Sequence, residues 1–98
     1  MKFAAIIEYT EDQAKILEHR PVHRQYLTAL LARGQLAIAG PFTDDSGSLI
    51  VYEAASREEA EKLLQGDPFH QHGIFMQYQL RPWNTVLANR ELFPAKVG

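Results

Sequence analysis

In four short stretches of the chain, every second residue is apolar. This period of two predicts β-strands, in which successive side chains point to opposite faces of a sheet. The stretches are residues 3–9, 35–39, 48–54 and 74–83. The first and third are apolar in both alternating sets, which is typical of central strands covered on both sides. The last alternates apolar with polar positions, so we expect it to be half buried.

Two segments with helical spacing lie between these strands. In residues 12–33 apolar side chains recur at spacings of three and four, and the expected buried face is made by Val22, Tyr26, Leu27, Leu30 and Leu31. Pro21 interrupts this pattern, so either the helix kinks there or a new helix begins with Pro21 in its first turn. Residues 56–65 open with a capping box, in which Ser56 caps the helix and Glu59 reaches back.

The predicted order of elements is βαββαβ. One antiparallel sheet with both helices on one face is the most economical α+β arrangement of this order. The helices would leave apolar strand residues uncovered on the second face, and a second copy of the sheet is the simplest cover, which predicts a homodimer. We expect a single domain over residues 1–98, with a core at 2–83 and a C-terminal extension at 84–98. The extension is apolar enough that we expect it to pack on its own domain or on a partner subunit.

Composition narrows the classes of function. The chain has 98 residues, 46% of them apolar and 22% charged, which is typical of one globular domain. The net charge is −2 with histidine neutral, so we expect no binding to nucleic acid or to an anionic membrane. Cysteine is absent, which excludes disulfides and a cysteine nucleophile and fits a cytoplasmic location. The short apolar run before Glu8 predicts neither a signal peptide nor a membrane helix.

The corner Gly66-Asp67-Pro68-Phe69 follows the second helical segment. We expect Gly66 to end that helix in the left-handed conformation. Pro68 cannot continue a helix and favours an extended conformation at Asp67. A carboxylate held on such a corner can orient a histidine, and His23 is the candidate. The alternative is that Asp67 and Pro68 serve only as turn residues.

Several short motifs in a fixed order resemble the YCII-related family, small proteins of the dimeric α/β-barrel group with a ferredoxin-like fold. They are Arg20-Pro21-Val22-His23 with Tyr26-Leu27, then Gly34, Ala39-Gly40-Pro41-Phe42, Gly47, Asp67-Pro68-Phe69 and Gly73-Ile74-Phe75. The resemblance implies that His23 and Asp67 form a catalytic dyad. It also implies a pocket, which we expect to be lined by Arg20, Gly40, Pro41, Phe42 and Phe69.

The resemblance further implies chemistry on a small, cyclic or aromatic organic substrate, since one branch of the family resembles dehydrochlorinases and related barrels include muconolactone isomerase. Histidine is the natural proton carrier near neutral pH, and Arg20, one helical turn before His23, can bind an anionic oxygen. We therefore expect an isomerase- or lyase-type reaction with no cofactor. The alternative is a non-enzymatic module that binds or senses a small ligand.

A metal site is a further alternative. His19 and His23 are four residues apart, which can place two ligands on one helix face, and His70 and His72 add two more. Pro21 weakens this reading, because His19 can lie outside the helix that holds His23. We expect His70 and His72 to be exposed loop residues and expect no metal.

Overall fold

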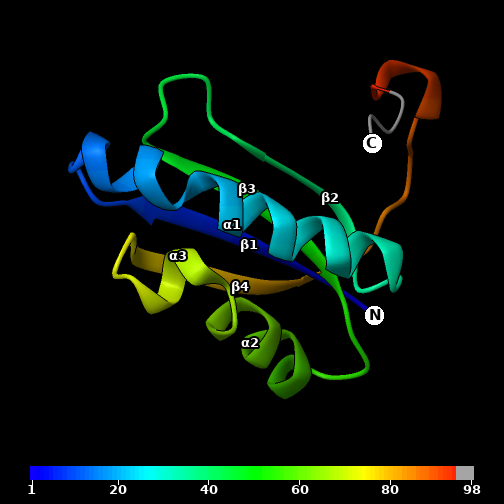
Figure 1. Cartoon of the computed structure of the whole chain (residues 1–98). Helices are drawn as coiled ribbons and strands as arrows, with labels where there is room; N and C mark the ends of the chain where they lie inside the picture. Colours follow the sequence, from blue (N-terminus) through cyan, green and yellow to red (C-terminus); the bar gives the residue numbers. More distant parts are fainter. Residues whose placement is uncertain (95–98) are drawn as a thin grey trace.

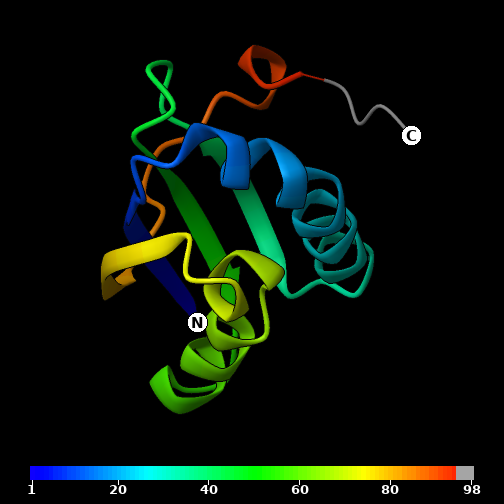
Figure 2. The ribbon, with the colours of Figure 1, turned by 60° about the vertical axis from the view of Figure 1, so that its left-hand side comes forward.

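The computed structural model describes residues 1–94. Four antiparallel strands form one sheet in the order β2-β3-β1-β4. The elements are β1 (Lys2–Tyr9), α1 (Gln13–Ala32), β2 (Leu36–Pro41), β3 (Gly47–Glu53), α2 (Arg57–Gln65), α3 (Pro68–Gln71), β4 (Phe75–Trp83) and the 3-10 turn η1 (Arg90–Leu92). Helices α1 and α2 lie against the same face of the sheet (Figures 1 and 2). The predicted ferredoxin-like α+β fold is therefore confirmed.

Strand β1 lies at the centre of the sheet and has a covered and an open side. Its residues Phe3, Ala5, Ile7 and Tyr9 face the helices and are at most 6% exposed. On the other side Ile6 is 44% exposed, and Leu49, its register partner on β3, is 37% exposed. One face of the sheet thus carries the core, and the other face of the single chain presents apolar side chains to solvent.

Helix α1 runs without a break through Pro21. Proline removes the hydrogen bond to the carbonyl four residues earlier. That carbonyl belongs to Leu17, whose side chain is 63% exposed, so the lost bond falls on the outer side of the helix, where water can replace it.

The buried stripe of α1 agrees only in part with the predicted one, since Leu30 is buried and Tyr26 and Leu27 pack against the core. It is made by Ile16, His23 and Leu30, spaced seven apart, whereas Val22 is 44% exposed and Leu31 is 38% exposed. The hydropathy pattern counted His23 as polar and therefore turned the predicted face too far. In the fold, His23 occupies a core position of the helix.

The corner after α2 confirms one prediction and corrects another. Asp67 is extended, with φ −67° and ψ 131°, and Pro68 begins α3. Gly66 is not left-handed, since its φ is −76°. A Cβ at Gly66 would lie 2.7 Å from the Tyr26 hydroxyl, which donates a 2.6 Å hydrogen bond to the Leu63 carbonyl. Glycine is needed there for close packing against α1, not for its backbone freedom.

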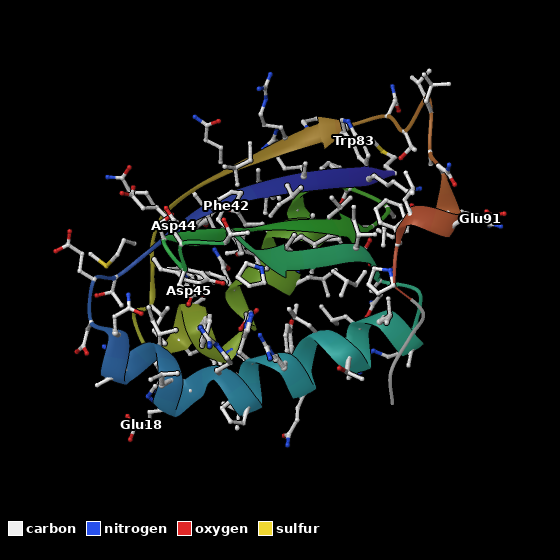
Figure 3. The ribbon with its side chains drawn as sticks, turned by 90° about the horizontal axis from the view of Figure 1, so that it is seen from above. Glu18, Phe42, Asp44, Asp45, Trp83 and Glu91 are labelled. Carbon is white, nitrogen blue, oxygen red and sulfur yellow. The ribbon has the colours of Figure 1, made fainter. Side chains whose placement is uncertain are left out.

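The β2–β3 hairpin turns later than predicted, because β2 extends to Pro41. The turn begins at Phe42, whose N–H donates to the Gly47 carbonyl at 2.8 Å. Asp45 in this turn has a φ of 58°. In Figure 3 this loop lies at the end of the sheet next to the first half of α1.

The segment after β4 turns away from the sheet and the helices (Figures 1 and 2). Val86 is 84%, Leu87 91%, Leu92 79% and Phe93 51% exposed. Packing of residues 84–94 on their own domain is therefore wrong, and packing on a partner subunit stays a prediction. Residues 95–98 lie outside the described part of the chain. No helix within residues 1–94 is both long and apolar enough to cross a bilayer.

Candidate active site

His23 and Asp67, 44 positions apart in the sequence, meet in the interior. The Nδ1 atom of His23 lies 2.7 Å from Oδ1 of Asp67, and the two residues are 6% and 0% exposed. The same Oδ1 accepts the backbone N–H of Phe69 at 2.9 Å, so Asp67 is also the N-cap of α3. The backbone of the corner therefore holds the carboxylate in place independently of its contact with the imidazole.

The pairing decides which ring nitrogen can react. Since Asp67 accepts a hydrogen bond at Nδ1, the neutral ring carries its proton there and leaves a lone pair on Nε2. Nε2 makes no hydrogen bond to another described residue, and it is not among the polar atoms sealed from solvent, whereas Oδ2 of Asp67 is sealed and unpartnered. His23 thus has one nitrogen fixed and one free, the arrangement required of a general base.

Aromatic rings fix the plane of the imidazole. The Phe69 ring is stacked on His23 at a centroid distance of 3.8 Å and an interplanar angle of 1°. Phe75 meets His23 edge-on at 6.3 Å. Phe69 is only 1% exposed, so it supports the imidazole from within the core. Rotation of the ring away from Asp67 would break this packing.

Arg20 lies one helical turn before His23, and its Nη2 is 3.3 Å from Oδ1 of Asp45. Their side chains are 24% and 43% exposed. In Figure 3 the turn with Phe42 and Asp45 lies at the end of the sheet facing the first half of α1, and Glu18 points away from the sheet. Arg20 is therefore positioned at the rim of the site, with part of its charge balanced by Asp45.

Tyr9 and Ser48 belong to the same region, and the sequence analysis did not assign them to the site. Tyr9 ends β1 and Ser48 is near the start of β3; they are 6% and 2% exposed. Burial raises the pKa of Tyr9 above its usual range, while the nearby Ser48 hydroxyl lowers it, Asp67 raises it and Arg20 lowers it. The available signal was a polar residue, Ser48, at an inward position of a strand.

The remaining predicted pocket residues lie at the end of β2. Pro41 is the register partner of Ser48, and Gly40 is the partner of Leu49. Phe42 follows the strand and is 42% exposed. Gly40, Pro41 and Phe42 thus come to the same end of the sheet as His23, but on its rim.

Two hollows on the surface lie elsewhere. One of about 310 Å³ is bordered by Met1, Glu53 and Leu63. The other, about 750 Å³, runs along α1 between Asp12 and His19. Neither is lined by His23, so the case for a candidate site at His23 and Asp67 rests on their chemistry and not on a cavity.

The histidines considered as metal ligands lie in three places, and His70, expected in an exposed loop, is instead half-buried in α3 beside Phe75. His19 stacks on His72 at 3.9 Å with an interplanar angle of 13°, while His23 is bound to Asp67. Within residues 1–94, no three His, Asp or Glu side chains are grouped so that they could hold a metal ion. The described geometry therefore gives no support to the metal alternative.

The sheet order and the position of both helices define a ferredoxin-like α+β protein, here with a buried histidine–aspartate pair at one end of its core. The YCII-related domain matches residues 1–84, and the chain belongs to this family. The predicted membership is confirmed.

Individual relatives agree with this assignment. The uncharacterized protein YjpA of Bacillus subtilis is 41% identical over 51 residues, which are 52% of this chain and 60% of YjpA. The chain thus spans less than two thirds of YjpA. Protein YciI of Escherichia coli is 29% identical over 92 residues, covering 80% of this chain and 94% of YciI.

Solved structures with the same fold include two enzymes. The 5-chloro-2-hydroxyhydroquinone dehydrochlorinase TftG of Burkholderia phenoliruptrix, in complex with 2,5-dihydroxybenzoquinone, has a TM-score of 0.76 and 26% identity, covering 86% of this chain and 94% of TftG. Muconolactone isomerase has a TM-score of 0.63 and 13% identity, covering 98% of both chains. The second likeness is one of fold alone.

Proposed function

We propose that this protein catalyses proton transfer on a small organic substrate, with His23 as the proton carrier. Asp67 holds the imidazole in one tautomer and stabilises the imidazolium, and Arg20 binds an anionic oxygen of the substrate. The observation that carries the proposal is the 2.7 Å contact between Nδ1 of His23 and the buried Asp67 carboxylate, with Nε2 left free.

The cost of this arrangement supports a functional role. A buried polar pair contributes little net stability compared with well-packed apolar residues. Asp67 already caps α3 without help from His23, and His23 stands in a row with Ile16 and Leu30 where an aliphatic side chain would pack. The fold therefore accepts a desolvation cost at a position where packing alone would favour leucine.

The reaction would begin when Nε2 of His23 removes a proton from a carbon next to a carbonyl or enol. The electron pair of that C–H bond forms a new double bond. In an elimination, a leaving group such as chloride departs with its own bonding pair. In an isomerisation, the imidazolium returns the proton to a different carbon. The likeness to TftG, a dehydrochlorinase, supports the first course.

The open face of the sheet supports a homodimer. Ile6 and Leu49 are register partners and are 44% and 37% exposed, and a second copy packed on this face would bury them. The dimer, the absence of a cofactor and the cytoplasmic location are parts of this proposal.

A ligand-binding module without catalysis is the second candidate. The contact between Arg20 and Asp45 favours it, because it leaves Arg20 only partly available to an anionic substrate. In that case the dyad would hold α1 to the corner at Asp67 and would not transfer a proton.

The test is a screen for turnover of lactones, enols and halogenated hydroquinones. The wild type and His23→Gln are compared, and the absorbance of the substrate or product is the readout. We expect the variant to lose about a hundredfold or more in rate, as is typical when general acid–base catalysis is removed. His19→Gln, one turn earlier on α1, is the matched control and should turn over the substrates at the wild-type rate. Turnover that survives His23→Gln would reject His23 as proton carrier, and saturable binding without chemistry would favour the module.

A further inference from the structure

We propose that the Tyr9 hydroxyl, positioned by Ser48, binds the oxygen of planar phenolic or enolic ligands beside Nε2 of His23. This inference deepens the proposed function and rests on it for the location of the ligand. It adds a second binding group, from a different strand, to a site so far defined by α1 and the corner at Asp67.

The first support is the position of the Tyr9 ring. Its edge meets the Phe69 ring at 5.4 Å and an interplanar angle of 85°. Phe69 is also the ring on which His23 is stacked. Tyr9 and His23 are therefore both held by one buried aromatic side chain, which keeps the phenol and the imidazole in fixed relation.

The second support is the surroundings of the phenol oxygen. Asp67, Arg20 and Asp45 all act electrostatically on the Tyr9 hydroxyl. These residues come from α1, from the β2–β3 turn and from the corner before α3. Tyr9 thus lies within electrostatic reach of charged groups from three segments of the candidate site.

The third support is the hydrogen bonding of the two hydroxyls. Oγ of Ser48 is sealed from solvent and has no hydrogen-bond partner among the described residues. Ser48 is the register partner of Ile7, two residues before Tyr9 on the same side of the sheet, and its hydroxyl lowers the pKa of the Tyr9 phenol. The Tyr9 hydroxyl makes no hydrogen bond to another described residue and is not sealed. An unpaired buried hydroxyl is unfavourable, so a ligand that draws Tyr9 into line with Ser48 would satisfy both groups.

Protonation decides the role of Tyr9. Burial raises the pKa of the phenol, so Tyr9 keeps its proton at neutral pH and donates a hydrogen bond. A donor is needed where negative charge appears on oxygen, as it does when a base removes a proton next to a carbonyl or from a phenol. Tyr9 is therefore suited to an enolate or phenolate oxygen, while Nε2 of His23 takes the proton.

Aromatic side chains surround the Tyr9 ring at this end of the sheet. The Tyr9 ring is stacked with Phe75 at 6.1 Å and an interplanar angle of 8°, and Phe42 at the rim is 42% exposed. Aromatic walls with a few donors select planar ligands that carry one or two oxygens. The class is that of small hydroxylated rings and their enol or quinone forms.

The experiment measures binding of 4-nitrophenol and of 2,5-dihydroxybenzoquinone to the full chain by absorbance titration across pH. We expect Tyr9→Phe to weaken binding by about tenfold to a hundredfold, the effect of losing a hydrogen bond to a charged oxygen. We also expect the pKa of bound 4-nitrophenol to lie below its value in water for the wild type and to return towards that value in Tyr9→Phe. Ser48→Ala should move both quantities in the same direction by a smaller amount.

The matched control is Tyr52→Phe. Tyr52 lies on the same covered side of the sheet, is fully buried and also has a hydroxyl without a partner. Tyr9→Phe keeps the ring that packs on Phe69, and circular dichroism with thermal unfolding would verify that each variant is folded. Tyr52→Phe should bind both probes like the wild type.

The outcomes separate this inference from the proposed function. Tyr9-dependent binding of the probes, together with no turnover of any compound in the separate screen, would support the inference and count against catalysis by His23. Wild-type binding that Tyr9→Phe leaves unchanged would overturn the inference and leave the role of His23 to its own screen. Failure of the folded wild type to bind either probe would also overturn it.

Discussion

The two ends of the sheet face that the helices cover are both buried, but their side chains differ in polarity. At one end Phe3, Tyr52 and Leu80 pack against Ala60 and Leu64 of α2, all at most 7% exposed. At the other end Tyr9, Ser48, His23 and Asp67 are buried to a similar degree. Figure 3 shows Asp45 near the second end and Trp83 towards the first. Both ends are buried, but the charged pair lies at the second end only, whereas the first end holds one polar side-chain group, the Tyr52 hydroxyl.

The difference shows what each end contributes. Burial of apolar side chains stabilises the folded state by about 25 cal/mol per Å². This burial accounts for the contribution of the apolar end to stability. Buried polar groups cost free energy unless they are hydrogen-bonded. At the polar end Ser48 Oγ and Asp67 Oδ2 remain unpaired, and at the apolar end the Tyr52 hydroxyl does. The apolar end therefore supports the fold, while the polar end holds the groups to which we assign ligand binding in our proposal.

The largest effect on this comparison is expected from Asp67→Ala. The change removes the partner of His23 Nδ1 and the N-cap of α3 together. We expect the free energy of unfolding to fall by about 3–5 kcal/mol, the cost of breaking a buried polar pair, measured by urea denaturation.

Asp12→Ala is the matched control for that variant. Asp12 also caps a helix, since its Oδ1 accepts the backbone N–H of Lys15 at 3.1 Å, but it is exposed. Its loss should cost about 1 kcal/mol. Equal effects of the two substitutions would mean that the buried contact with His23 adds nothing to stability.

Leu64→Ala at the apolar end should have the next largest effect. Leu64 is fully buried, and such truncations cost about 2–5 kcal/mol through lost burial and a residual cavity. Because no ligand group is removed, the folded fraction should keep the probe affinity of the wild type. A loss of probe binding as large as that of Tyr9→Phe would contradict a separation of the two ends.

Tyr52→Phe should have the smallest effect at neutral pH. The hydroxyl of Tyr52 is buried without a partner, so its removal should leave the free energy of unfolding equal to the wild-type value or raise it by about 1 kcal/mol.

The same variant should differ from the wild type in alkali. Burial raises the pKa of Tyr52 far above its usual range, so the unfolded chain loses this proton at about pH 10 and the folded chain does not. The free energy of unfolding should therefore fall as pH rises above about 10, and less steeply in Tyr52→Phe. Equal slopes in denaturation curves measured between neutral and alkaline pH would contradict this assignment.

Local chemistry predicted several elements correctly. Ser56 caps α2 and accepts the Glu59 N–H at 3.2 Å, and the Glu59 side chain reaches back to the Ala55 N–H at 2.8 Å. Pro68 keeps Asp67 extended before α3. Each of these features depends on residues within a few positions, and their conformational preferences are visible in the sequence.

The site was only partly predictable. The sequence suggested His23, Asp67 and Arg20 through spacing and the family resemblance, and the fold brings His23 and Asp67 into contact and Arg20 to the same end. Tyr9 and Ser48 were missed, because a tyrosine and a serine within apolar strands are ordinary in a core. Their significance comes from α1, which places the charged groups above this end of the sheet.

The sequence by itself determined the alternation of strands, the helix caps and the stiff corner at Asp67, since these follow from short-range sterics and hydrogen bonding. Only the tertiary structure decided which side of α1 is buried and why residue 66 must be glycine. Both depend on packing between distant segments: His23 rests on Phe69, and Tyr26 fills the space beside Gly66. Such contacts arise when the helix docks on the sheet, so no local preference records them.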